Sequence, residues 1–314
     1  MIRDYKADCS AVEGADVPMV SAVVASKDRR AGVERLIGDL GRQGYPAGRL
    51  EIVVVDDGSA SAYKLGQGVR VIRHERSLGA QRSRNEGVAA ARGELVLMLD
   101  DDIELEGDDF IRRGVEVLGR QEGVALVAGR KMDVTGENGR ARTAEFSVGR
   151  LTGYSGDLVR GEAAGGEVDW PNQVYLVRRA ALLEIGGYDG IYGLNGGHSF
   201  REESDVHARL RARGYRLWHE PRMGVRHHIT SEGGHGASVG RRLFWIAHNH
   251  IIFLRRHVKW WRLRALGFLI DVGRYSWVQG RFRYLFSMLG GYAAGWRNAL
   301  RDRGCGKNPW LEQR

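Results

Sequence analysis

The stretch G-E-L-V-L-M-L-D-D-D-I-E, residues 93–104, decides the predicted fold of this chain. Its apolar run, 95–99, lies close to a glycine and stops at three consecutive carboxylates, Asp100, Asp101 and Asp102. An apolar run of this length next to glycine predicts a buried strand. Open α/β folds bind ligands at the carboxyl ends of such strands, so a ligand site is expected at the acidic end of this one.

Three adjacent carboxylates repel one another unless a cation lies among them. Hard divalent ions prefer oxygen ligands of this kind, which predicts Mn²⁺ or Mg²⁺ as a cofactor. The alternative is a solvated acidic turn that caps the next helix, a common use of one or two aspartates. Three aspartates at the end of a buried strand fit that alternative less well.

The composition is that of a soluble globular protein, with 43% hydrophobic and 28% charged residues in 314. The net charge of +9 favours an anionic partner such as a nucleotide, a nucleic acid or a lipid surface. The two cysteines, Cys9 and Cys305, indicate no disulfide framework, which fits a reducing compartment. The first residues lack the apolar core of a signal peptide. The sequence contains no uninterrupted run of ~18 apolar residues, so no membrane-spanning helix is expected.

Strands and helices alternate along the chain. Before the acidic cluster, strands are predicted at 19–25, 50–55 and 69–72, and helices at 32–43 and 79–92. After it, helices are predicted at 108–120, 179–185 and 201–213, and strands at 124–127, 173–177 and 217–225. This order predicts an α/β fold with a mostly parallel sheet flanked by helices.

A second strand also ends in carboxylates, in V-V-V-D-D-G-S at residues 53–59. Two parallel strands that finish in this way build one polar crevice, where Asp57 can accept hydrogen bonds from a nucleobase or a ribose. Taken alone, the motif also fits a turn with a helix cap. On the helix before the acidic strand, Arg82, Arg84 and Asn85 are candidates for contact with a diphosphate, the alternative being ordinary surface residues.

The segment E-E-S-D, residues 202–205, opens a helix after a glycine-rich loop. The helix dipole favours carboxylates there, so capping is one explanation, and a general base for an acceptor hydroxyl is the other. Adjacent helix positions point to different sides, so Glu202 and Glu203 are not expected to act alike. Near the end of the next strand, a histidine of the pair His227 and His228 can complete a metal site begun by carboxylates. Histidine is not scarce in this chain, so the pair alone is a weak signal.

Six segments together resemble the family-2 type of glycosyltransferases with a GT-A fold. They are V-S-A-V-V-A-S-K-D-R at 20–29, V-V-V-D-D-G-S at 53–59, G-A-Q-R-S-R-N-E-G at 79–87, L-M-L-D-D-D at 97–102, G-G-Y-D at 186–189 and R-E-E-S-D-V-H-A-R-L-R-A-R-G-Y at 201–215. The resemblance extends over residues 17–228, most of the chain. It implies an inverting enzyme that moves a sugar from a nucleotide-diphosphate sugar to an acceptor hydroxyl.

The resemblance also implies roles for single residues. It places Ser26, Asp28 and Asp57 at the nucleoside, with Arg84 near it. Asp100 and Asp102 match the D-x-D of the family, which holds the ribose and a divalent metal on the diphosphate, and His227 joins them as the third predicted metal ligand.

Glu203 occupies the place of the family's base, which is usually aspartate. Because glutamate has a longer reach than aspartate, either Glu203 or its neighbour Glu202 can act as the base, and Glu202 is the second catalytic candidate. Asp101, Trp170 and Asp205 complete the predicted substrate-binding residues.

Three regions are expected. Residues 1–17 are a disordered lead-in, and residues 18–240 form the GT-A domain, with a nucleotide-sugar half to about residue 130 and an acceptor half after it. Residues 241–314 form a helical, basic and aromatic extension, in which Asp271 and Asp302 are the acidic residues between 241 and 303. Its aromatic residues either form a core below a solvated basic face or bind an anionic membrane or partner.

Other functions are compatible with parts of the sequence. A sugar-phosphate nucleotidyltransferase also uses an α/β sheet and acidic metal ligands, but it usually carries a glycine-rich basic signature after its first strand, which is missing here. A basic nucleic-acid-binding protein would explain the charge, but no nucleic-acid motif is present, so no nucleic acid is expected as a partner. A catalytically dead scaffold would not need the complete acidic set.

The expected partners are a nucleotide-diphosphate sugar and a glycan or lipid-linked acceptor, in polysaccharide, glycolipid or cell-envelope synthesis. The expected location is the cytoplasm, with peripheral attachment to the inner face of the cell membrane through residues 241–303.

Overall fold

The computed structural model describes residues 17–135, 140–143, 165–196, 199–228, 239–278 and 285–302. The predicted disordered lead-in lies outside the described residues except for Val17. Both cysteines also lie outside them.

The first half of the chain forms the predicted parallel sheet. Its strands are β1 (Val20–Ser26), β2 (Leu50–Asp56), β3 (Val69–Arg73) and β4 (Leu95–Asp100), and its helices are α1 (Arg30–Gly41) and α2 (Ala80–Ala90). The strand order is β3-β2-β1-β4, with every pairing parallel. Helix α2 crosses β1 closely at Gly87, where a Cβ atom would come within 2.4 Å of Val23. This close approach explains the small residues of the segment that predicted α2.

The second half extends the sheet by antiparallel as well as parallel pairs. Its elements are β5 (Ile103–Leu105), α3 (Phe110–Arg120), β6 (Val124–Thr135), β7 (Arg140–Thr143), β8 (Gly166–Glu167), β9 (Tyr175–Arg178), α4 (Arg179–Glu184), the 3₁₀ helix η1 (Gly190–Gly196), α5 (Glu202–Ala212) and β10 (Arg216–His228). Strand β9 joins β4 to β6 antiparallel, and β6 pairs parallel with β10. The predicted α/β fold is thus confirmed, and its sheet is mixed in this half.

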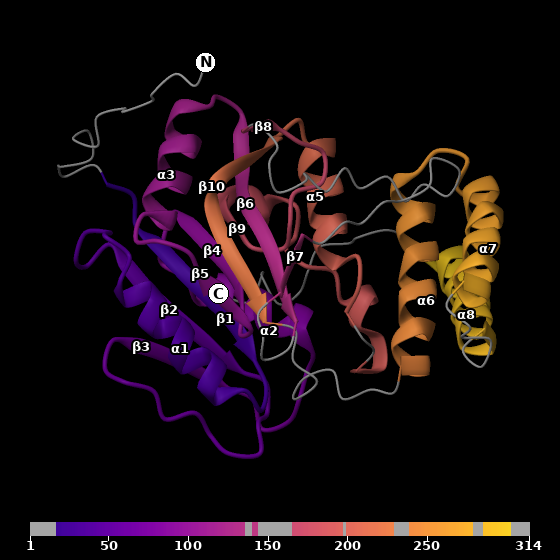
Figure 1. Cartoon of the computed structure of the whole chain (residues 1–314), viewed down its shortest axis with the longest axis horizontal. Coiled ribbons are helices and arrows are strands. Elements are labelled where there is room, and N and C mark those ends of the chain that lie inside the picture. The colour runs from indigo at the N-terminus through magenta and orange to yellow at the C-terminus, as the bar shows by residue number, and fades with distance from the viewer. Residues whose placement is uncertain are drawn as a thin grey trace.

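Two hydrophobic cores cover the two faces of the sheet. Helices α1 and α3 pack on one face through residues such as Leu36 and Phe110. Helices α2, α4 and α5 pack on the other through residues such as Val88 and Leu210. Figure 1 shows the sheet between these two layers.

The last part of the chain forms a separate helical layer beyond α5, as the orange and yellow ribbons of Figure 1 show. Its helices are α6 (Val239–His257), α7 (Trp261–Val278) and α8 (Leu285–Arg301). They enclose a third core around Ile251 and Phe253, which also takes in Tyr192 from η1. Among the described residues, no helix has both the length and the apolar character needed to cross a membrane.

Candidate functional site

Three parallel strands bring the acidic residues of the sequence to one edge of the sheet. Strand β1 lies between β2 and β4, with Ser26 paired to Asp56 and Ala25 paired to Asp100. The carboxyl ends of the strands therefore meet, as the sequence predicted. We call the three consecutive carboxylates Asp100, Asp101 and Asp102 the acidic edge.

Arg29, in the loop after β1, lies between two carboxylates of the acidic edge. Its Nη1 donates to Asp101 Oδ1 at 2.9 Å and to Asp102 Oδ2 at 2.8 Å. Ser26 Oγ donates to the other oxygen of Asp101 at 2.7 Å. Burial raises the pKa of Asp101 to about 6, although Ser26 and Arg29 act in the opposite direction. The protein thus supplies one cation of its own to a cluster that requires positive charge.

His227, near the end of β10, approaches the acidic edge from another strand. Its Nδ1 lies 2.8 Å from Asp133 Oδ1, and its Nε2 lies 3.5 Å from Asp102 Oδ1. Burial favours the neutral imidazole, but the two carboxylates dominate and raise the pKa of His227 to about 9. Burial also opposes ionisation of Asp102, but His227 and Arg29 lower the pKa of Asp102 to about 2. Asp102 and His227 therefore form an ion pair.

The predicted metal ligands are only partly brought together. Asp102 and His227 adjoin, whereas Asp100 directs its carboxylate to Arg84. In the part of the chain that the structure describes, no three side chains of His, Cys, Asp or Glu converge as a ready metal site. Asp102 Oδ1 is nevertheless buried, and its contact with His227 Nε2, at 3.5 Å, is too long for a well-formed hydrogen bond.

Arg84, on α2, joins the acidic edge to the start of α5. Its Nη2 lies 2.8 Å from Asp100 Oδ1, and its Nη1 lies 3.2 Å from Oε1 of both Glu202 and Glu203. The guanidinium also lies over the ring of Tyr188, 5.3 Å from its centroid. We call Arg84, Asp100, Glu202 and Glu203 the Arg84 cluster.

The two glutamates of the Arg84 cluster converge on one guanidinium, so the expectation that they point to different sides of the helix was wrong. Glu202 is the first residue of α5 and Glu203 the second, where the long side chains still reach the same Nη1. They differ in exposure, with 4% of the Glu202 side chain and 19% of the Glu203 side chain accessible. Glu203 is therefore the one that a substrate can reach more readily.

Burial raises the pKa of both glutamates. Burial, and then the charge of Glu203, raise the pKa of Glu202 to about 8, against the lowering effect of Arg84. Burial likewise raises the pKa of Glu203, although Arg84 acts against it. A carboxyl group with a raised pKa next to a cation can exchange a proton near neutral pH, which is what acid–base catalysis requires.

The carboxylate of Asp57 holds a loop in place. It accepts hydrogen bonds from Ser77 Oγ at 2.6 Å and from the backbone N–H groups of Leu78 at 2.7 Å and Gly79 at 3.0 Å. Burial opposes ionisation, but these hydrogen bonds and His74 together lower the pKa of Asp57. The loop that Asp57 fixes leads directly into α2 and Arg84.

Asp28 and Ser26 also tie loops together. Asp28 lies in the left-handed backbone region, with φ 55°, and its Oδ1 accepts from the N–H of Ala60 at 2.8 Å. Ser26 lies between Asp101 and the hydroxyl of Tyr63, 2.9 Å away. Asp28 is exposed, whereas Ser26 and Asp57 are buried.

Asp205 and Trp170 contact the helical layer instead of the acidic edge. Asp205 is fully buried, and its carboxylate accepts from Arg209 at 2.7 Å and from His257 Nε2 at 2.7 Å. Burial opposes ionisation, but His257 and Arg209 lower the pKa of Asp205 to about 2. The ring of Trp170 packs edge-on against Phe253 of α6 at 5.5 Å.

Two residues of the site had no predicted role. Arg29 stands in the quoted segment 20–29, but nothing in its spacing shows that it turns back onto the acidic edge. His74 bridges Asp57 at 2.8 Å and Glu86 at 2.6 Å, and no motif contains it. Both contacts depend on tertiary structure.

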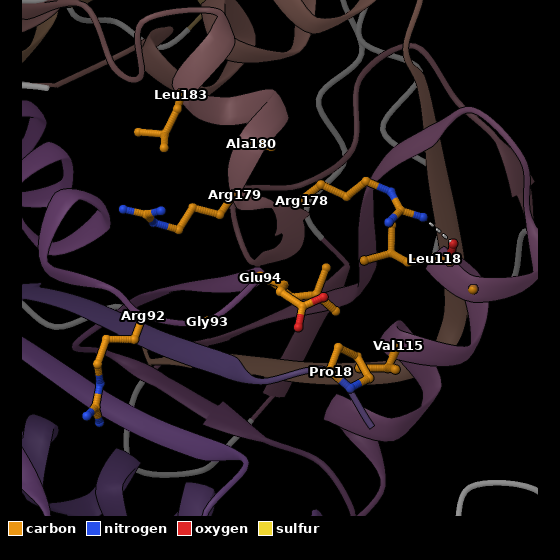
Figure 2. A pocket seen from close by; sticks show the side chains of 12 residues that line it. Pro18, Arg92, Gly93, Glu94, Val115, Leu118, Arg178, Arg179, Ala180 and Leu183 are labelled. Atoms are coloured by element: carbon orange, nitrogen blue, oxygen red, sulfur yellow. Dashed lines mark hydrogen bonds between the residues drawn. The ribbon is translucent and has the colours of Figure 1, made fainter. Parts of the chain in front are cut away.

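A hollow of about 570 Å³ lies at the amino end of β4, the opposite end of the strand from the acidic edge. Figure 2 shows Pro18, Glu94, Arg178 and Arg179 around it. Arg178 donates to the carbonyl of Leu118 at 2.6 Å, and Arg179 donates to the carbonyl of Val88 at 3.0 Å. Because both guanidinium groups bind helix ends, this hollow is not assigned to the candidate site.

The sequence model described as "Glycosyl transferase family 2" matches residues 21–170. Residues 21–170 of the chain are therefore those of a family-2 glycosyltransferase domain. The residues that match the family include Asp57, Arg84 and the acidic edge, whereas Glu202, Glu203 and His227 lie beyond them.

Two relatives of this chain are each 31% identical to it. An uncharacterized protein of Sinorhizobium fredii matches over 243 residues, which is 72% of this chain and 26% of that protein. The pre-mycofactocin glycosyltransferase of Mycobacterium tuberculosis matches over 219 residues, which is 66% of this chain and 42% of that protein. The chain thus spans less than half of the length of either relative.

The solved structure of GalNAc-T7 with UDP, GalNAc and Mn²⁺ has a similar fold. The TM-score is 0.53 at 19% identity, over 75% of this chain and 48% of GalNAc-T7. This similarity confirms the predicted GT-A fold, and the match over residues 21–170 supports the predicted family.

Proposed function

We propose that this family-2 protein is an inverting glycosyltransferase that moves a sugar from a nucleotide-diphosphate sugar to an acceptor hydroxyl. The observation that carries the proposal is the Arg84 cluster. One guanidinium contacts a carboxylate at the end of β4 and two glutamates at the start of α5. It therefore connects the edge suited to a diphosphate with the helix suited to a general base.

In the proposed reaction the acceptor oxygen attacks the anomeric carbon of the donor sugar. The bond from that carbon to the diphosphate oxygen breaks, and the electron pair leaves with the nucleoside diphosphate. The proton of the acceptor hydroxyl passes to Glu203, whose side chain is the more exposed of the two glutamates. A single displacement inverts the anomeric carbon and requires one base, unlike hydrolysis by a pair of carboxyl groups on either side of the bond.

Asp100, Asp102 and His227 are proposed to hold a divalent metal, Mn²⁺ or Mg²⁺. His227, which is paired with Asp102 and Asp133 here, would release a proton to become a ligand. The buried Asp102 Oδ1, whose described partner is His227 at the long distance of 3.5 Å, supports this metal site, because carboxylate oxygen is a preferred ligand of these ions. Bound there, the metal would stabilise the negative charge that develops on the departing diphosphate. GalNAc-T7, with its similar fold, was solved with Mn²⁺ and UDP, which supports a metal and a nucleotide donor here.

The nucleoside is proposed to lie at the loops after β1 and β2. Asp28 is exposed there and is the proposed direct contact. Ser26 and Asp57 are buried and hold the surrounding loops in place, so their proposed contribution to nucleoside binding is the shape of the site. Three further residues are proposed to support the substrate site indirectly, by positioning the residues that they contact: Asp101 contacts Arg29, Trp170 contacts Phe253, and Asp205 contacts His257.

The acceptor is proposed to be a glycan or a lipid-linked molecule of polysaccharide, glycolipid or envelope synthesis. The proposed location is the inner face of the cell membrane, reached from the cytoplasm. The arginine-rich and aromatic sequence of residues 241–303 supports this part of the proposal, because such surfaces bind anionic lipids.

The base is tested by comparing Glu203→Gln with Glu202→Gln. The first variant keeps the size of the side chain and removes its basicity, so turnover should fall by ~10²–10⁴ with donor affinity nearly unchanged. Glu202→Gln should cost less than tenfold, and Glu184→Gln on the surface of α4 is the control for a glutamate change elsewhere. The reverse ranking would make Glu202 the base. If neither variant slows transfer, both glutamates only cap α5.

Donor binding is tested by thermal shift with nucleoside diphosphates and nucleotide sugars, with and without Mn²⁺. A ligand that binds only the folded protein raises its melting temperature. A rise that requires both the nucleotide and Mn²⁺ is expected. No shift with any nucleotide would overturn the proposed donor.

A further inference from the structure

The exposed large apolar side chains of this protein gather in one region. Within the described residues there are eight of them, and all belong to residues 239–300, with none in the sheet and its flanking helices. Four lie on α7 or just before it: Trp260 at 78% exposure, Leu263 at 64%, Leu266 at 55% and Ile270 at 65%. Large exposed apolar side chains that gather in one region indicate an interaction site.

Helix α7 is apolar on two opposite sides. Ala265 and Phe268 are buried in the third core, where Phe268 contacts the ring of His250 at 4.4 Å. Leu263, Leu266 and Ile270 fall within an arc of roughly 60° on the opposite side, given the 3.6-residue period. Figure 1 shows α7 on the edge of the molecule farthest from the sheet. The outer side of α7 therefore faces solvent with nothing from the sheet near it.

Basic side chains accompany this apolar side. Lys259 and Arg262 are exposed at the beginning of α7, and Arg255 is exposed at the end of α6. Asp271 is the one acidic residue in the α7 sequence, and Asp302, after α8, pairs with Arg256. Apolar side chains with cationic neighbours are typical of helices that lie in the interface of an anionic membrane.

We infer that the outer side of α7, with Trp260, Leu263, Leu266 and Ile270 as its apolar part and Lys259 and Arg262 as its cations, is the surface that docks on an anionic bilayer. The inference deepens the proposed function, on which it rests for the membrane-linked acceptor. A second copy of the chain fits the surface less well, because two basic faces would be brought together.

Flotation with vesicles tests this inference on the full chain. The wild-type protein should bind vesicles that contain phosphatidylglycerol and should bind pure phosphatidylcholine weakly. The triple variant Leu263→Gln, Leu266→Gln, Ile270→Gln should lose roughly 100-fold in partitioning, since each change removes part of the apolar transfer free energy. Lys259→Gln with Arg262→Gln should lose roughly 30-fold on anionic vesicles only, about fivefold per charge.

The control for charge is Lys64→Gln with Arg120→Gln, which removes two exposed cations from the sheet domain. This control should bind vesicles like the wild type. The inference fails if the control loses as much vesicle binding as the Lys259→Gln, Arg262→Gln variant, or if the triple variant binds vesicles like the wild type. It also fails if the wild-type protein is a dimer and the triple variant is a monomer.

Thermal shift with UDP and Mn²⁺ on the same variants separates this inference from the proposed function. The triple variant should keep the wild-type response to nucleotide, which also shows that it is folded. A protein that binds vesicles through α7 but no nucleotide would leave the surface assignment standing and overturn the proposed donor.

Discussion

Arg256 of α6 should be one of the most costly side chains to remove, because it neutralises carboxylates from three separate segments. It donates to Asp302 at 2.6 and 2.8 Å and to Asp189 at 2.8 Å, and it lies 3.6 Å from Asp205 of α5. Only 7% of its side chain is accessible. Its replacement by methionine fills similar space but leaves Asp302 and Asp189 without this cation, while Asp205 keeps Arg209 and His257.

Breaking a buried ion pair by removing one partner typically costs ~3–5 kcal/mol. For Arg256→Met we therefore expect the free energy of unfolding to fall by about 4 kcal/mol, a large part of the ~5–15 kcal/mol of a typical protein. The midpoint of thermal unfolding should fall by roughly 10 °C.

The neighbouring variant Arg255→Met is the matched control. Arg255 is exposed and lies over the ring of Trp261, 5.9 Å from its centroid, so its loss should cost ~0.5–1 kcal/mol. Urea unfolding followed by circular dichroism measures both variants. If Arg256→Met and Arg255→Met differ by less than ~1 kcal/mol, the buried charge network does not hold the helical layer to α5 and the reasoning fails.

Three further predictions concern the site. Asp102→Ala should abolish Mn²⁺-dependent nucleotide binding in thermal shift while circular dichroism stays unchanged, and retained Mn²⁺ dependence would refute the metal assignment. Arg29→Gln should lower the melting temperature without metal and enlarge the rise that Mn²⁺ causes, because the cation between Asp101 and Asp102 is gone; an unchanged rise would refute this role. Glu202 has a pKa of about 8 in the folded protein against 4.5 unfolded, so its stabilising effect is full below pH 4.5 and is lost as pH rises through 8. Urea titrations should show less loss of stability over this range in Glu202→Gln than in wild type, and identical slopes would contradict the raised pKa.

The acidic edge could be predicted because strand ends are local features. The apolar run before Asp100 identifies the strand, and parallel order along the chain brings its carboxyl end next to those of β1 and β2. The antiparallel insertion of β9 could not be predicted in this way, since a short apolar run does not report which strand it will pair with or in which direction.

Contacts between side chains that are far apart in the sequence were harder to predict. Arg84 was expected to meet a diphosphate, but its contact with Glu202 links residues 118 positions apart. In the segment E-E-S-D, the glutamates were predicted to be catalytic candidates and Asp205 to bind substrate, whereas Asp205 turns to the helical layer and the two glutamates turn to Arg84. Only the packing of α6 against α5 separates these two roles.

Of the two interpretations of the C-terminal aromatic residues, the core applies to some of them, and binding to a membrane or partner stays a prediction for the others. Phe253 and Phe268 are buried in the third core, whereas Trp260 is 78% exposed. The composition of this region does not distinguish buried from exposed apolar residues. Helix α7 has apolar residues at helical spacing on both sides, and only one side packs into the third core.

The helical layer also positions the start of α5, where the two glutamates of the Arg84 cluster lie. Asn249 of α6 donates to the carbonyl of Phe200 at 3.1 Å, just before α5 begins, and Arg201 lies over the ring of Phe253 at 4.8 Å. Arg201 has φ 73°, a conformation that a non-glycine residue holds only when its surroundings enforce it. The contacts of α6 thus fix the first turn of α5, from which Glu203 reaches Arg84. Removal of residues after 240 would take away these contacts together with the partners of Asp205, so the effect of the C-terminal region on membrane binding must be read from point variants and not from a shortened chain.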